Sequence, residues 1–200
     1  MLKDNRFVVH CVRALASAAL IAASMLISPT QSDAQAAPGT GALAVGEVAP
    51  DFTIKSVNAN GLTVKPFHLA EHRGETVVIA FFPKARSQGC TVQMESYRDN
   101  YSTLMHNGNK VTLIAISIDP DTALQSWARE AKFQFSFGSD VDHAVGAKFG
   151  ASNATGGHKR VLYVINPDGK IGYLASPFKQ LSAGAYTELG LAIDKAASMH

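Results

Sequence analysis

Three short apolar runs, separated by longer segments of mixed polarity, restrict the folds open to this chain. Each run is largely apolar at successive positions rather than at alternate ones, which is typical of strands that helices cover on both faces. The runs are Val77 to Phe82, Val111 to Ile118 and Val161 to Ile165. A length of 200 residues suits a single domain. We therefore expect one α/β domain, in which a mixed sheet, parallel in the middle and antiparallel at one edge, has helices on both faces.

The segments between the apolar runs carry helix and turn signals. Four of them place apolar residues at helical spacing, with glycine or proline near an end. These predicted helices cover residues 91–107, 119–132, 142–149 and 183–196. Residues 52–55, 62–69 and 133–137 are predicted to form short strands. The turn Asn166-Pro167-Asp168-Gly169 predicts a hairpin that joins residues 161–165 to 171–174.

The N-terminus has the pattern of an export signal. Lys3, Arg6 and Arg13 precede the small and apolar run 14–27, and Ala34-Gln35-Ala36 offers a cleavage site after Ala36. The run is shorter than the roughly 20 residues that a membrane-spanning helix needs. We therefore predict a signal peptide over residues 1–36, a flexible lead-in over 37–44 and a domain over 45–197. The mature protein would be periplasmic or secreted and free of the membrane; an uncleaved N-terminal anchor is the alternative.

The cysteine count points to one reactive or one inert thiol. Of the two cysteines, Cys11 lies in the predicted signal peptide, so the mature chain keeps only Cys90. A lone thiol in an oxidising compartment is either buried and inert or has its oxidation as its function. Cys90 follows a predicted buried strand and opens a predicted helix, where the helix dipole stabilises a thiolate. The near-neutral net charge of +2 and the scattered basic residues argue against a nucleic-acid partner.

The surroundings of Cys90 match a family motif of proline, three residues, threonine or serine, two residues and cysteine. Pro83, Ser87 and Cys90 fit it. The chain resembles a peroxiredoxin of the Q-type, or bacterioferritin-comigratory, branch on a thioredoxin-like fold. Further residues that fit are Ala49-Pro50-Asp51-Phe52, Arg160 and Asn166-Pro167-Asp168-Gly169. The resemblance covers roughly residues 45–195.

The resemblance implies a thiol-dependent peroxidase that reduces hydrogen peroxide or organic hydroperoxides through a sulfenic acid on Cys90. Arg160, which stays charged, is expected to stabilise the thiolate and hold the peroxide. The Ser87 hydroxyl and the backbone amide of Gly89 are expected to bind substrate, and Pro83 to shield the sulfur. No cofactor or metal is implied. The expected partners are the peroxide and an external thiol reductant, either a small thiol or a thioredoxin-like protein, and the chain is expected to be a monomer or homodimer.

The chain departs from the branch at three positions. Ser87 replaces a threonine, Gln88 stands where proline is common, and Glu95 occupies the position of a resolving cysteine. With no second cysteine in the mature chain, the expected cycle uses Cys90 alone. The rival functions are a thioredoxin-like thiol–disulfide oxidoreductase and a non-catalytic secreted binding module.

Simpler explanations of single residues also stay open. The alternative to a catalytic role is that Ser87 only caps the helix and that Arg160 is an ordinary surface residue. A separate alternative function is a hydrolase in which Cys90 and His158 form a catalytic dyad. Gln93 faces the same side as Cys90, and its role is left open.

Overall fold

The computed structural model describes residues 43–63 and 65–199 of the chain. These belong to one compact unit, residues 38–200. The predicted signal peptide, with Cys11, and the predicted lead-in up to residue 42 lie outside the described residues. Within the described part, no helix is long and apolar enough to cross a membrane.

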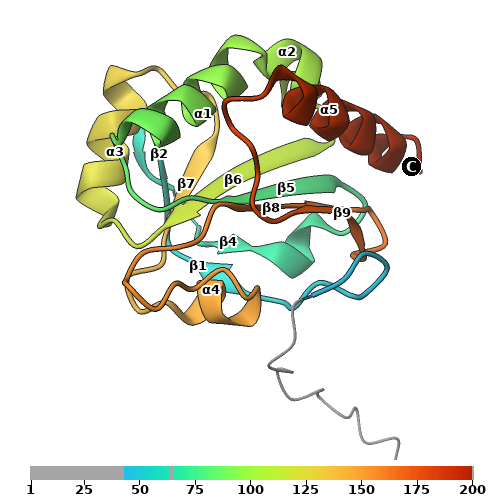
Figure 1. Cartoon of the computed structure of the whole chain (residues 1–200), viewed down its shortest axis with the longest axis horizontal. Coiled ribbons are helices and arrows are strands. Elements are labelled where there is room, and N and C mark those ends of the chain that lie inside the picture. Colours follow the sequence, from blue (N-terminus) through green and yellow to red (C-terminus); the bar gives the residue numbers. More distant parts are fainter. Residues whose placement is uncertain (1–42, 64, 200) are drawn as a thin grey trace, which may run out of the picture. The chain divides into compact units, whose positions relative to one another are not determined.

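A seven-stranded mixed sheet forms the centre of the domain (Figure 1). Its strand order is β3-β2-β7-β6-β5-β8-β9. The strands are β2 (Ser56–Asn58), β3 (Gly61–Leu62), β5 (Thr76–Phe81), β6 (Val111–Ser117), β7 (Ser136–Ser139), β8 (Val161–Ile165) and β9 (Ile171–Ala175). β5, β6 and β7 run parallel, while β8 and β9 at one edge and β2 and β3 at the other are antiparallel. The expected parallel centre is confirmed, but the expectation of a single antiparallel edge is wrong, because the 56–62 hairpin adds a second.

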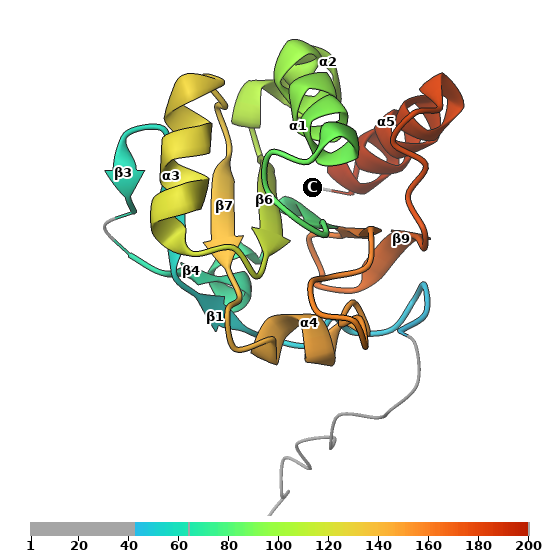
Figure 2. The same ribbon diagram turned by 60° about the vertical axis from the view of Figure 1, so that its left-hand side comes forward.

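Alternate side chains of β5 separate two apolar layers. Val78 and Ala80 join a buried cluster with α1 (Gln88–Asp99), α3 (Asp121–Glu130) and α5 (Ala183–Ala197). Val77 and Ile79 join a second buried cluster on the opposite face, with α4 (Ala144–Lys148) and the separate two-stranded sheet of β1 (Thr53–Ile54) and β4 (Phe67–His68). Figure 2 shows the same arrangement, with α4 and β1 on the side away from α1. Successive side chains of a strand point to opposite faces, and here both faces pack against helices. The prediction of helices on both faces of the sheet is thus confirmed.

The segment predicted as one helix over 91–107 is divided in the structure. α1 starts earlier, at Gln88, and ends at Asp99; α2 (Tyr101–Leu104) and a 3-10 turn, η2 (His106–Gly108), follow. Asn107 has a φ of 55°, which interrupts helical geometry. The early start places Cys90 in the first turn of α1.

Two other predictions were wrong in their boundaries. The segment 62–69 is not one strand, since β3 pairs with β2 while β4 pairs with β1, and Leu69–His72 forms a 3-10 turn, η1. The segment 133–137 joins the sheet only from Ser136, because Phe133 packs edge-on against Trp127 of α3 at 5.3 Å instead. The phenylalanines of both segments are buried, as the local apolar pattern predicts. Whether a segment joins a sheet depends on pairing with strands that are distant in the sequence, which the local pattern does not show.

Candidate active site

The loop after β5 leads from the carboxyl end of that strand to Cys90, in the first turn of α1. The thiol is fully buried, with 0% of its surface exposed. The amide of Ala85 donates to a carboxylate oxygen of Asp119 at 2.7 Å. Arg86, which adopts a left-handed φ of 63°, donates to Glu130 of α3 at 2.7 Å. Asp119 lies just before α3 and Glu130 ends it, so these two contacts fix the loop to α3. The Arg86 side chain stays 45% exposed while it makes this contact.

Arg160 lies against the sulfur. Its Nη2 atom donates to Cys90 Sγ at 3.3 Å, across 70 residues of sequence. The sheet explains the approach: β8 begins at Val161, whose partner on β5 is Phe81. Arg160 therefore stands beside the point where the chain leaves β5 and enters the Cys90 loop. Arg160 is therefore not a free surface residue, which was the alternative for this position.

Gln93 is the residue whose contacts the sequence left open. It is fully buried one turn after Cys90, and its Oε1 atom accepts a hydrogen bond from Arg160 Nη1. Its Nε2 atom donates to the hydroxyl of Tyr97 at 2.8 Å. The positions 90, 93 and 97 share one face of α1. The spacing can be seen in the sequence and predicts that Tyr97 lies in the core, but it does not reveal the hydrogen bond between Gln93 and Tyr97.

Ser87 occupies the N-cap position of α1 without capping it through its side chain. Its exposed hydroxyl donates instead to the carbonyl of Lys84 at 3.0 Å. The first backbone bond of the helix runs from the Thr91 amide to the Ser87 carbonyl, at 2.8 Å. The amides of Gly89 and Cys90 belong to the first turn, which has no partners within the helix.

Gly89 lies beneath two side chains from elsewhere in the chain. A Cβ atom at this position would lie 2.9 Å from Gln180 Nε2 and 3.4 Å from Arg160 Nη2. Gln180 was not among the predicted site residues, because it lies in the loop between β9 and α5, far from Gly89 in the sequence. Pro83, half-buried, is in contact with Gly157, where a Cβ would lie 3.0 Å from the Pro83 carbonyl oxygen.

His158 pairs with a carboxylate rather than with the thiol. Both it and Asp140 are buried, and His158 Nε2 lies 3.0 Å from Asp140 Oδ2. Burial opposes ionisation of Asp140, but His158 and the amides of Val145 and Gly146 outweigh it and hold the pKa of Asp140 below its ordinary value. The structure gives no support to a Cys90–His158 dyad. Within residues 43–63 and 65–199, no three His, Cys, Asp or Glu side chains are grouped to hold a metal ion.

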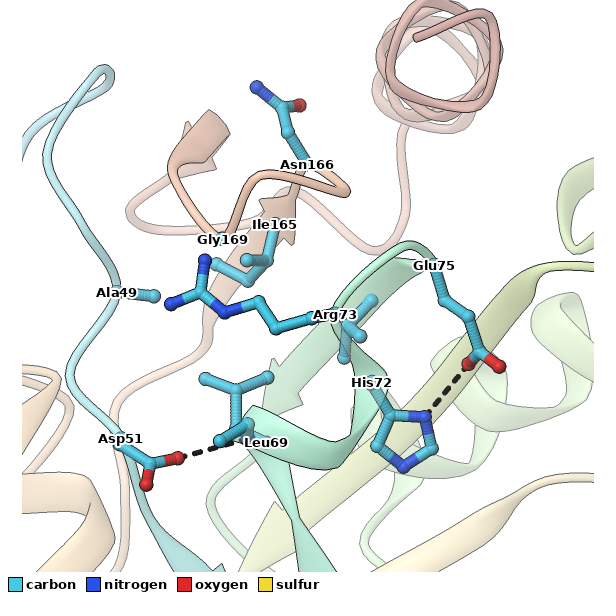
Figure 3. Close-up of a pocket in the computed structure, with 11 residues that line it drawn as sticks. Ala49, Asp51, Leu69, His72, Arg73, Glu75, Ile165, Asn166 and Gly169 are labelled. Carbon is cyan, nitrogen blue, oxygen red and sulfur yellow. Dashed lines mark hydrogen bonds and ion pairs between the residues drawn. The ribbon is translucent and has the colours of Figure 1, made fainter. Parts of the chain in front are cut away.

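A separate small pocket lies at the opposite end of β5 and β8 (Figure 3). Figure 3 shows the Arg73 side chain extended between Ala49 and Gly169. Its guanidinium donates to the carbonyl of Asp168. The pocket thus holds an arginine of the chain itself, and we assign no chemistry to it.

Comparison with known proteins places the chain in a family. Residues 45–174 match the model of the AhpC/TSA family. The chain is 31% identical to Peroxiredoxin Bcp of Escherichia coli over 144 residues, which cover 68% of this chain and 88% of the relative. It is 30% identical to chloroplastic Peroxiredoxin Q of Triticum aestivum over 167 residues, or 82% of this chain and 72% of the relative.

Solved structures agree on the fold. A structure of Peroxidoxin BcpB from Mycobacterium tuberculosis matches with a TM-score of 0.65 at 23% identity, covering 76% of this chain and 96% of that one. Peroxiredoxin Q of Xanthomonas campestris matches with a TM-score of 0.62 at 20% identity, covering 73% and 91%. The expected thioredoxin-like arrangement is confirmed. With the family match spanning more than half of its length, this chain belongs to the AhpC/TSA family and is a peroxiredoxin, a thiol-dependent peroxidase similar to the Bcp and Q proteins.

Proposed function

We propose that this peroxiredoxin reduces hydrogen peroxide and small organic hydroperoxides by a one-cysteine cycle at Cys90, with Arg160 as its cationic partner. The observation that carries the proposal is the 3.3 Å contact between Arg160 Nη2 and Cys90 Sγ. A guanidinium cannot lose its proton, and at this distance it favours the thiolate over the thiol. The position in the first turn of α1 acts in the same direction.

The proposed reaction is an in-line displacement at oxygen. The thiolate attacks one peroxide oxygen, a sulfur–oxygen bond forms, and the oxygen–oxygen bond breaks. The departing oxygen leaves as hydroxide or alkoxide and takes a proton from water, while sulfur, oxidised by two electrons, becomes a sulfenic acid. Arg160 and the backbone amides of Gly89 and Cys90 are placed to stabilise charge on the departing oxygen.

The role proposed for Ser87 follows from the orientation of its hydroxyl. Because the hydroxyl donates to the Lys84 carbonyl, its lone pairs remain as acceptors. We therefore assign the Ser87 hydroxyl to accept a hydrogen bond from the O–H group of a hydroperoxide. Pro83 is assigned to limit access of water to the sulfur.

The one-cysteine cycle follows from the sequence. The chain has two cysteines, and Cys90 is the one within the family match. Glu95, at the resolving position of related two-cysteine enzymes, instead lies 3.7 Å from Arg98 as an ion pair. The sulfenic acid is then reduced by an external thiol, either a small molecule or a thioredoxin-like protein. A dithiol oxidoreductase is disfavoured, because Ser87 stands three residues before Cys90 where a second cysteine would be needed.

The cellular location belongs to the same proposal. The basic start, the apolar run and the small residues up to Ala36 support export, followed by cleavage and release into the periplasm or medium. Mass spectrometry of protein recovered from that compartment tests this: a mature chain beginning at Ala37 supports it, and a chain that retains residues 1–36 contradicts it.

Peroxide consumption with dithiothreitol as reductant tests the chemistry. We expect wild type to consume hydrogen peroxide and Cys90→Ser to show only the uncatalysed rate. After one equivalent of peroxide, mass spectrometry should place one added oxygen on Cys90. Equal consumption by the two proteins would exclude the mechanism, and a thiol that is alkylated but never oxidised would favour the binding-module alternative.

A further inference from the structure

We propose that Tyr97 is a positioning residue of the peroxidase reaction, because it fixes Gln93 so that Gln93 orients the Arg160 guanidinium beside Cys90. The inference rests on the role proposed above for Arg160 and Cys90. It gives a chemical task to a side chain that the sequence places only in the core.

Four side chains form a continuous series from the sulfur into the helix face. Arg160 uses one end of its guanidinium, Nη2, on Cys90 and the other, Nη1, on Gln93. Gln93 in turn donates to Tyr97 at 2.8 Å. Cys90, Gln93 and Tyr97 are each 0% exposed, and the bond between Gln93 and Tyr97 is buried, so water does not compete for that bond.

The direction of every bond in the series is determined by Arg160. A guanidinium only donates, so the group that faces it must be an acceptor. Gln93 therefore turns its carboxamide oxygen to Arg160 and its nitrogen to Tyr97, which must accept through its hydroxyl oxygen. Without that acceptor, the buried nitrogen would lack a partner. The carboxamide would then lose the interaction that keeps its oxygen towards Arg160.

Tyr97 also contacts the segment that holds the backbone of Arg160. Its ring packs against Phe178 at a centroid distance of 6.4 Å and against Tyr186 at 6.1 Å. The amide of Phe178 donates to the carbonyl of Arg160 at 2.9 Å. Burial raises the pKa of Tyr97, which keeps its hydroxyl neutral. The ring thus supports Arg160 through packing, and the hydroxyl supports it through Gln93; only the second contribution is lost in Tyr97→Phe.

The test is a double-variant cycle on the purified, processed protein, in which Tyr97→Phe is made alone and together with Gln93→Glu. The readout is the single-turnover rate constant of Cys90 oxidation by hydrogen peroxide. We expect Tyr97→Phe alone to slow oxidation about tenfold, the scale of a lost buried hydrogen bond. A carboxylate presents an acceptor at both oxygens, so in the Gln93→Glu background the same change should have an effect of less than about twofold.

The controls separate positioning from packing and from failure of the proposed function. Tyr101→Phe, the same chemical change on the half-buried ring of α2, should leave the rate unchanged. If Tyr97→Phe slowed oxidation equally with and without Gln93→Glu, Tyr97 would act through packing, and no slowing in either case would mean that it has no part; both results overturn the proposal. If wild type matched Cys90→Ser, the proposed function itself would fail, whatever Tyr97 does.

Discussion

At the scale of single residues, Arg160 matters because its planar fork reaches two acceptors at once. One arm contacts Cys90 Sγ and the other contacts Gln93. Lysine offers a single charged nitrogen, which cannot hold both in the same geometry. We expect Arg160→Lys to lower kcat/KM for hydrogen peroxide by about 10–100-fold, the range seen when one oriented donor is displaced.

The matched control for that change is Arg98→Lys, on the outer face of α1. Arg98 pairs with Asp99 at 2.8 Å, away from the sulfur. Steady-state kinetics of the two variants should differ by more than about tenfold. An Arg160→Lys enzyme as active as Arg98→Lys would show that charge alone, without the fork, is sufficient.

Gly89 gives a second prediction, which concerns space. An alanine methyl group would lie 2.9 Å from Gln180 Nε2 and 3.4 Å from Arg160 Nη2. Gln180 must move away from the methyl group, and Arg160, which is held by Gln93, must also shift slightly. Gly89→Ala should therefore slow Cys90 oxidation by roughly three- to tenfold.

Removing the opposing side chain checks the cause. In Gly89→Ala combined with Gln180→Ala, the methyl group gains room, and the oxidation rate should recover at least in part. If the double variant is slower than Gly89→Ala alone, then Gln180 contributes to the reaction rather than merely occupying space.

The sequence was informative about single residues where chemistry is concentrated in a local motif. Cys90, Ser87 and Pro83 were identified because they fit the family motif, and Arg160 by the same resemblance, while their roles stay predictions. Gln93 had only its helical spacing from Cys90 as a signal. Gln180 had none, because its contact with Gly89 joins loops that only the folded sheet brings together.

At the scale of elements, the loop between β5 and α1 depends on its attachment to the start of α3. Asp119 accepts from the Ala85 amide at 2.7 Å and from the Ser117 hydroxyl at 2.9 Å, and both bonds end on the same oxygen, Oδ2. Asp119→Ala should destabilise the fold by about 1–3 kcal/mol, since the loop amide loses its partner. Cys90 oxidation should slow because the loop sets the place of α1.

Asparagine at the same position is the natural control. A single carboxamide oxygen in the place of Oδ2 can accept both bonds. Urea unfolding should thus rank Asp119→Asn close to wild type and Asp119→Ala well below. Equal losses in the two variants would mean that charge at this position, rather than the two bonds, holds the loop.

The same scale shows why some elements were predicted and others were not. Strands such as β8 could be predicted because their residues form a continuous apolar and aromatic run, and all five residues of β8 are buried in the structure. The pairing of β2 with β7 was missed, since Ser56 and Asn58 give no apolar signal and the partner strand lies far along the chain. The break after α1 was missed because Tyr101 and Leu104 continue the helical spacing.

At the scale of the whole molecule, a buried carboxylate–histidine pair connects three segments of the domain. Asp140 follows β7, accepts from the amides of Val145 and Gly146 at 3.0 and 2.7 Å, and lies 3.0 Å from His158, two residues before Arg160. Against the effect of burial, these partners hold the pKa of Asp140 below its ordinary value of 3.8. Because the folded state then binds this proton less readily, the carboxylate stabilises the fold fully above about pH 4. That stability is lost as the pH falls through the folded-state pKa.

Urea unfolding between about pH 2 and 7 tests this consequence. Asp140→Asn should be less stable than wild type by about 1–3 kcal/mol near neutrality, and the difference should shrink as the pH falls below about 4. Asp194→Asn, which alters the exposed contact between Asp194 and His106, should show no comparable trend. Parallel curves for wild type and Asp140→Asn would contradict the assignment.

The 70 residues between Cys90 and Arg160 also affect when the chain becomes sensitive to oxidants. Until β8 docks beside β5, the Arg160 guanidinium cannot reach the sulfur of Cys90. Under the role proposed for Arg160, a polypeptide still emerging from the ribosome, or truncated before residue 160, lacks the group that contacts Cys90 Sγ and should be oxidised slowly. On that proposal, the chain becomes sensitive to peroxide only when it is complete enough to reduce peroxide.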